Sequence, residues 1–231
     1  MKILMLDVYP QVNYRVCKDN NGGFGTGNDL GDTFVSKILK SYLKKSIDFP
    51  PLSFVSIMGQ LRGNGNEIKY SREITNEKFD LCVLASSIVA HETELEAVLK
   101  LKNIGIPTLV VGPFATSVPE PYIKNGGKVV IGEPEFYFFD FKLNKKEIQN
   151  LPDKIVFNHF FSLDDLYYPA WDLIFQYKKP KFNLLSKGYT IPIQATRGCP
   201  YSCSYYCTYP LQQGKKLRTR NTDEVLKEML F

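Results

Sequence analysis

The sequence has no run of 18 or more apolar residues, so it predicts no membrane-spanning helix. It also predicts no signal peptide, because Asp7 interrupts the apolar N-terminus before a hydrophobic segment of sufficient length forms. An excess of one charge is lacking too, since 29 basic and 24 acidic residues leave a formal charge of only +5. This weak, mixed charge does not favour nucleic acid as a partner. We therefore expect a cytoplasmic protein that acts on a small-molecule substrate.

Histidine and cysteine are scarce, at two and five residues. An odd number of cysteines does not suit a disulfide framework, and three of the five lie within nine residues. These three are Cys199, Cys203 and Cys207, and their crowding favours metal binding in a reducing compartment. Cys17 and Cys82 lie far away in sequence, so we expect them to take no part in such a site.

The 231 residues, 44% of them hydrophobic, can form one sizeable domain and part of a second. In the first part, short apolar runs alternate with helical patterns, which predicts an α/β domain with a doubly wound, Rossmann-like parallel sheet. The helix expected over 33–45 has an apolar stripe that should pack on the sheet. The predicted strands are 2–8, 67–70, 80–85, 108–111 and 128–131, and the other predicted helices are 51–63, 92–102 and 119–125.

Ligands of doubly wound sheets bind at the carboxyl ends of the strands. The residues at those ends are Ser86 and Ser87 after the third predicted strand, Gly112 after the fourth and Gly132 after the fifth. We expect these four residues to contact a bound cofactor.

After residue 141 the pattern changes. Residues 142–188 contain lysines, aromatics and prolines without a clear period, which predicts a linker. Residues 189–195 are strand-like, the cysteines follow, and 222–231 have the pattern of a helix. We therefore divide the chain into a domain over 1–141, a linker over 142–188 and the start of a second domain over 189–231.

The three cysteines offer soft thiolate ligands, which select iron–sulfur clusters, zinc or copper(I). A four-iron cluster normally takes four cysteines, so three would leave one iron open for another ligand. A structural zinc site wants four ligands, and His91 and His159 lie far away in sequence. The spacing i, i+4, i+8 is also that of a buried helical stripe, although a proline at 200 argues against a helix there.

The stretch from Arg197 to Cys203, continuing through Tyr206 to Pro210, resembles the signature loop of radical S-adenosylmethionine (radical SAM) enzymes with an N-terminal cobalamin-binding domain. The gap between Cys203 and Cys207 is one residue longer than is usual in that family. Three further segments are similar to connections in those enzymes: 112–120, 132–135 and 168–172.

The resemblance implies that Cys199, Cys203 and Cys207 bind a [4Fe-4S] cluster, with S-adenosylmethionine on the fourth iron and Tyr206 beside its adenine. It also implies a 5′-deoxyadenosyl radical, used for methyl transfer or ring formation at an unactivated carbon, and a one-electron reductase such as flavodoxin or ferredoxin. Residues 189–231 would be the first β/α unit of a TIM-type barrel, too little for complete catalysis.

Cobalamin binding stays open on the sequence, because the Asp-x-His-x-x-Gly motif of many cobalamin proteins is missing and His91 does not fit it. Two alternatives to a catalytic role also stay open. The chain could be a non-catalytic module that binds cobalamin or a nucleotide, with cysteines that relay electrons. The cysteine loop could instead hold a structural zinc ion.

Overall fold

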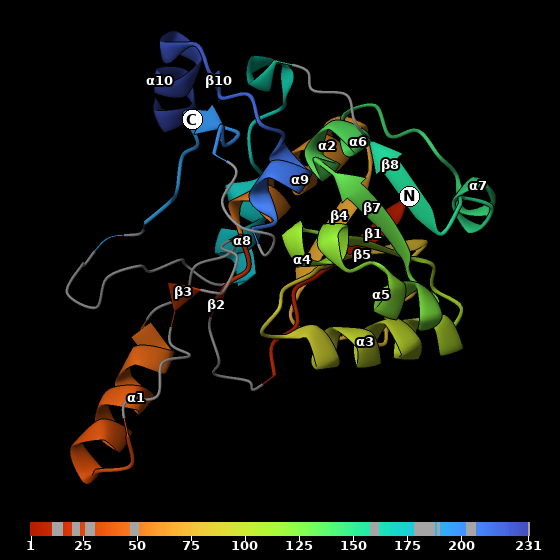
Figure 1. The fold of residues 1–231 in the computed structure, drawn as a ribbon. Coiled ribbons are helices and arrows are strands. Elements are labelled where there is room, and N and C mark those ends of the chain that lie inside the picture. The colour runs from red at the N-terminus through yellow and green to blue at the C-terminus, as the bar shows by residue number, and fades with distance from the viewer. Residues whose placement is uncertain are drawn as a thin grey trace.

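The computed structural model describes residues 1–10, 16–19, 24–25, 31–46, 51–157, 162–177, 188, 190–201 and 207–230. Six parallel strands in these ranges form one sheet, in the order β4-β1-β5-β6-β7-β8 (Figure 1). The order reverses between β1 and β5, as in doubly wound folds, so the predicted α/β fold with a parallel sheet is confirmed. The strands are β1 (Lys2–Leu6), β4 (Glu67–Ser71), β5 (Leu81–Ala85), β6 (Thr108–Val111), β7 (Lys128–Gly132) and β8 (Lys154–Phe157).

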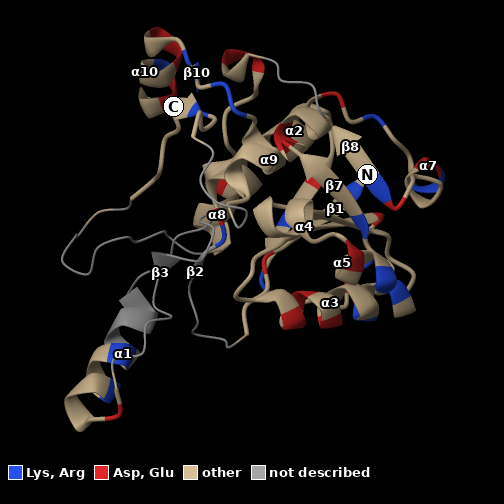
Figure 2. Ribbon diagram, viewed as in Figure 1, with Lys and Arg blue, Asp and Glu red and all other residues tan. Residues whose placement is uncertain are grey.

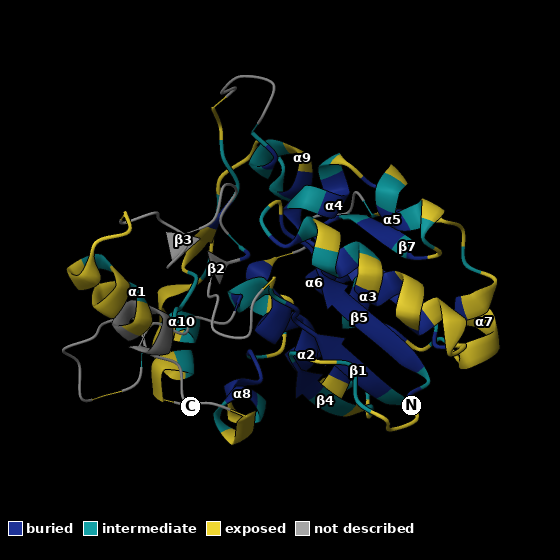
Figure 3. Cartoon of the chain, turned by 90° about the horizontal axis from the view of Figure 1, so that it is seen from below, coloured by how far each residue is buried: buried dark blue, intermediate teal, exposed yellow. Residues whose placement is uncertain are grey.

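Helices cover both faces of the sheet, and the central strands are therefore buried on both sides (Figure 3). In β1, Ile3 and Met5 pack in the core that includes α2 (Leu52–Gly63), α6 (Pro134–Phe139) and α8 (Trp171–Tyr177). Leu4 and Leu6 pack in the other core, with α3 (His91–Asn103), α4 (Pro113–Ser117) and α5 (Glu120–Lys124). This alternation explains why the strands are continuous apolar runs.

Charge is arranged along α3 in agreement with its helix dipole (Figure 2). Glu92 and Glu94 lie in its first turn, and Lys100 and Lys102 lie in its last turn. Acids near a helix N-terminus and bases near its C-terminus each stabilise a helix by about 0.3–1 kcal/mol when exposed. Glu94 is an exception because it is fully buried, and it belongs to a polar network described below.

The helix predicted over 33–45 forms as α1 (Phe34–Ser46), but the prediction that it packs on the sheet is wrong. Phe34 is 79% exposed and Ile38 is 56% exposed. The sheet face is covered instead by α2, in which every residue from Phe54 to Leu61 is buried. Because α2 is apolar on nearly all sides, it competes better for the core than the one-sided stripe of α1.

The predicted linker over 142–188 contains elements that the sequence analysis did not find. They are α7 (Lys145–Gln149), the sheet strand β8, a 3₁₀ turn over Leu163–Asp165, and α8. Helix α7 begins with a capping box in which Asn144 and Glu147 satisfy each other's backbone amides. Strand β8 is a short edge strand, so it has no long apolar run to reveal it. The domain boundaries themselves stay a prediction.

The strand predicted over 189–195 is also wrong, because residues 190–195 have no regular structure. Strand β9 (Thr196–Arg197) begins only afterwards and pairs antiparallel with β10 (Arg218–Thr219). Helices α9 (Tyr209–Gln213) and α10 (Thr222–Leu230) follow the cysteine loop, and α10 confirms the predicted helix. Two further short strands, β2 (Val16–Cys17) and β3 (Phe24–Gly25), form a separate ribbon. The partial barrel stays a prediction.

Among the described residues, no helix has both the length and the apolar character needed to cross a membrane.

Candidate functional site

A cleft of about 310 Å³ lies at the carboxyl edge of the sheet, where three parts of the chain meet. Residues after β6 and β7 form its floor, and the start of α2 together with Asp19 closes one side. The segment that carries the cysteines closes the other side. The lining residues are Asp19, Leu52, Ser53, Pro113, Glu133, Glu135, Pro192, Gln194, Arg197, Tyr209, Gln212 and Gln213.

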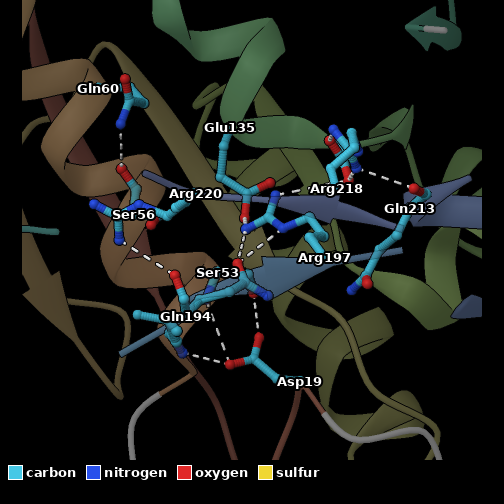
Figure 4. Close-up of polar contacts among 12 residues, drawn as sticks. Asp19, Ser53, Ser56, Gln60, Glu135, Gln194, Arg197, Gln213, Arg218 and Arg220 are labelled. Carbon is cyan, nitrogen blue, oxygen red and sulfur yellow. Dashed lines mark hydrogen bonds and ion pairs between the residues drawn. The ribbon is translucent and has the colours of Figure 1, made fainter. Parts of the chain in front are cut away.

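Two carboxylates and two guanidinium groups form a charge cluster at this cleft: Glu133, Glu135, Arg197 and Arg218. Figure 4 labels Glu135, Arg197 and Arg218 of this cluster. Arg197 Nη2 donates to Glu135 Oε1 at 2.9 Å, and its Nη1 lies 3.8 Å from Glu133 Oε1. Arg218 Nη1 donates to Glu133 Oε2 at 3.0 Å. The side chains of Glu133, Glu135 and Arg197 are at most 5% exposed. Each buried charge in this cluster therefore depends on its partners.

Burial and pairing act against each other on the ionisation of the cluster. Burial raises the pKa of Glu133, and the hydrogen bond from Arg218 opposes that shift only in part. Burial lowers the pKa of Arg197, but the carboxylates of Glu135 and Glu133 outweigh it and raise that pKa above its usual range. Arg197 is therefore a fixed positive charge in the wall of the cleft.

Asp19 links the start of α2 to the segment that follows the cysteines. Its carboxylate accepts hydrogen bonds from the backbone amide of Leu52 and from the hydroxyl of Ser53. Its backbone carbonyl accepts a hydrogen bond of 2.7 Å from the hydroxyl of Tyr209. Burial raises the pKa of the Asp19 carboxyl to about 6, although the bonds from Ser53 and Leu52 lower it.

This raised pKa predicts how stability depends on pH. The carboxyl of Asp19 binds its proton more tightly in the folded chain than in the unfolded chain, so its favourable contribution is complete below about pH 4. We expect that contribution, up to about 3 kcal/mol, to be lost as the pH rises through about 6. Urea titrations from pH 4 to pH 7 should show a shallower pH dependence for Asp19→Asn than for the natural chain. Parallel curves for the two proteins would contradict the raised pKa.

A backbone hydrogen bond holds one end of the cysteine loop, and packing of α9 holds the other. Cys199 donates its amide to the carbonyl of Gly214 at 3.2 Å, and α9 packs against α4 and β7. Cys199 and Cys207 are free thiols of intermediate exposure. Cys203 and Tyr206 lie outside the described residues, so the structure does not test their predicted roles. Within the described residues, no three metal-binding side chains come together.

Gly198 permits the close contact between the ribbon strands at this loop. Its φ is +104°, and a Cβ there would lie 2.1 Å from the carbonyl oxygen of Lys216. We expect Gly198→Ala to lower the free energy of unfolding by about 2–3 kcal/mol, measured by urea denaturation. Gly65→Ala is the matched control, because Gly65 has a φ of +77° and a Cβ there would meet no atom within 4 Å. This variant should show only the backbone strain, about 1 kcal/mol. Equal losses in both variants would refute the steric argument.

The four residues predicted to contact a cofactor do lie at the carboxyl edge, but none of them lines the cleft. Ser86 is buried and its hydroxyl accepts from the amide of Ala115 at 3.0 Å. The hydroxyl of Ser87 donates to Glu94 at 3.0 Å. Gly112 and Gly132 have φ values of +119° and +104°, and the residue after each one lines the cleft. Their cofactor role stays a prediction.

A second polar group, which the sequence analysis missed, is buried at the ends of β1 and β5. Lys18 Nζ lies 2.8 Å from Glu94 Oε1 and 3.4 Å from Asp7 Oδ1, and it donates to the carbonyl of Ala85 at 2.9 Å. Tyr122 also donates to Glu94, at 2.6 Å. Asp7, directly after β1, was visible in the sequence, but nothing there indicated that Lys18 is its partner.

The arginines of the charge cluster were also missed as a unit. The sequence has a basic run over 215–220, which contains Arg218 and Arg220. In the structure Arg218 pairs with Glu133, and Arg220 donates to Glu228. One feature of the sequence could have indicated this cluster: Glu133 and Glu135 come directly after a buried strand, and buried acids need cations as partners.

No family model matches this chain. The uncharacterized methyltransferase sll1242 of Synechocystis sp. is 26% identical over 209 residues, which cover 84% of this chain and 35% of that protein. The bacteriochlorophyllide d C-12(1)-methyltransferase of Chlorobaculum tepidum is 56% identical over 39 residues, which cover 17% of this chain and 8% of that protein. This chain thus spans about a third or less of the curated relatives it matches, and it is similar to proteins named as methyltransferases.

Proposed function

We propose that this chain supplies the cofactor-binding part of a methyltransferase of the radical SAM type, in which Cys199, Cys203 and Cys207 hold a [4Fe-4S] cluster. The observation that carries the proposal is the anchoring of the cysteine loop at the carboxyl edge of a doubly wound sheet. That edge is where such sheets bind their ligands. The similarity to two proteins named as methyltransferases supports methyl transfer as the reaction.

The donor atoms of the loop fit an iron–sulfur cluster. Cys199 and Cys207 are free thiols and not fully buried, so a cluster can reach them. Thiolates are the ligands of such clusters, and three of them leave one iron available to S-adenosylmethionine. When bound, the cluster supplies single electrons to that molecule. The protein would hold the loop and position the cluster and S-adenosylmethionine.

Tyr206 takes its proposed role from the resemblance to radical SAM enzymes. It precedes Cys207 in the sequence and would pack beside the adenine of S-adenosylmethionine. The sheet edge near Ser86, Ser87, Gly112 and Gly132 would receive cobalamin. In this proposal residues 1–141 form the cobalamin-binding-like domain, 142–188 connect it, and 189–231 begin the radical SAM domain.

Binding of S-adenosylmethionine to the cluster tests the proposal. The anaerobically reconstituted chain is reduced with dithionite, and its electron paramagnetic resonance spectrum is recorded with and without S-adenosylmethionine. We expect a changed spectrum, and we expect labelled S-adenosylmethionine to bind only to cluster-loaded protein. Equal binding to cluster-loaded and metal-free protein would overturn the proposed role of the loop. If S-adenosylmethionine left the spectrum of the cluster unchanged, the result would favour the alternative in which the cysteines only relay electrons.

A further inference from the structure

The ribbon of β9 and β10, which flanks the cysteine loop, is too short to be stable by itself. Each strand has two residues, and even longer isolated hairpins are marginal in water. Only Gly198 separates Arg197 of β9 from Cys199. The place of Cys199 is therefore set by whatever holds this ribbon on the sheet.

The ribbon also contains an unfavourable pair. Arg197 and Arg218 are directly opposite each other in the register of β9 and β10. Like charges in that arrangement repel and destabilise a strand pair. Glu133 contacts both guanidinium groups, with Arg218 Nη1 at 3.0 Å and Arg197 Nη1 at 3.8 Å. Its carboxylate neutralises the repulsion and joins the two strands to the sheet.

Glu133 is itself held rigidly. It follows Gly132, the last residue of β7, which has a φ of +104°. The backbone of Gly132 lies so close to Phe157 that a Cβ on Gly132 would be 2.3 Å from the carbonyl oxygen of Phe157. The side chain of Glu133 is 1% exposed, so water does not compensate for a lost partner. Glu135 adds a second bond to Arg197 at 2.9 Å, but it does not reach Arg218 by any contact described above.

From these contacts we infer that Glu133 is a positioning residue that fixes the ribbon, and through it Cys199, at the carboxyl edge of the sheet. The effect on the iron–sulfur cluster rests on the proposed function. The effect on the ribbon rests only on the contacts of the charge cluster, so the two effects can be tested separately.

Hydrogen exchange of the metal-free chain, measured by mass spectrometry, tests the positioning of the ribbon. In Glu133→Gln, we expect amides in 196–199 and 214–219 to exchange at least about tenfold faster, because the two facing guanidinium groups lose their shared carboxylate. Amides of β1 and β5 should be unchanged. Glu120→Gln is the matched control, since Glu120 pairs only with Lys154 on the surface in the ion pairs described here.

A double variant separates electrostatic positioning from general damage. If Glu133 acts by neutralising the facing arginines, Glu133→Gln combined with Arg218→Gln should exchange more slowly in the ribbon than Glu133→Gln alone. Faster exchange in the double variant, or equal acceleration in β1 and the ribbon of Glu133→Gln, would overturn the inference.

The loaded protein gives an independent readout. After anaerobic reconstitution, we expect the reduced cluster of Glu133→Gln to differ from that of the natural chain in midpoint potential and in paramagnetic resonance spectrum, whereas Glu120→Gln should match the natural chain. Absence of iron from the natural chain would refute the proposed function and leave the exchange result intact. Normal exchange and an unaltered cluster in Glu133→Gln would refute the positioning role alone.

Discussion

Replacing any one of Cys199, Cys203 or Cys207 with alanine is expected to abolish the visible absorbance of the reconstituted protein and to remove most of its iron. Three thiolates are the only ligands that the chain is proposed to give to the cluster, so losing one leaves two irons without protein ligands. Iron per chain should fall from about four to below about one. The measurement is iron and sulfide analysis of each variant after anaerobic reconstitution.

The other two cysteines provide the controls. Cys82 lies in β5, is fully buried, and has a thiol pKa that burial raises, so it is a poor metal ligand. Cys17 lies in the β2 ribbon, far in sequence from the loop. Cys82→Ala and Cys17→Ala should keep their absorbance. If all five substitutions reduced iron to the same extent, the assignment of the ligands would be wrong.

Removing the charge of Lys18 should have the largest effect on stability. Its side chain is 1% exposed, and its ammonium lies between the carboxylates of Asp7 and Glu94, whose side chains are fully buried. Breaking a buried ion pair from one side costs about 3–5 kcal/mol, because the remaining charge loses its partner. We expect Lys18→Met to lower the free energy of unfolding in urea by that amount at pH 8.

An exposed lysine gives the comparison for this loss. Lys37→Met, on the exposed helix α1, is the control and should change stability by less than about 0.5 kcal/mol. If Lys18→Met were as mild as the control, the network would not stabilise the fold.

The central strands could be predicted because burial on both faces leaves a direct trace in the sequence. Leu81 to Ala85 and Thr108 to Val111 are uninterrupted runs with little polar character, and both form strands. Helical periodicity also located α1, but it could not tell which surface the helix contacts. That choice depends on competition with α2 for the same sheet face, which is a tertiary property.

The charge cluster and the Lys18 network could not be predicted for a related reason. Each joins residues more than 60 positions apart, as in the pair Arg197 and Glu135 or the pair Lys18 and Glu94. A single sequence records that a buried acid needs a cation, but not which one. The cysteines, in contrast, lie close together in sequence, so a metal site could be predicted from them without the fold. The structure adds where the loop is anchored.

Metal and sulfide analysis of the anaerobically purified chain tests the central claim most directly. If Cys199, Cys203 and Cys207 hold an iron–sulfur cluster, the chain should contain about four iron and four sulfide ions and little zinc. One zinc ion per chain without inorganic sulfide would contradict the claim, because it would make the loop a structural metal site.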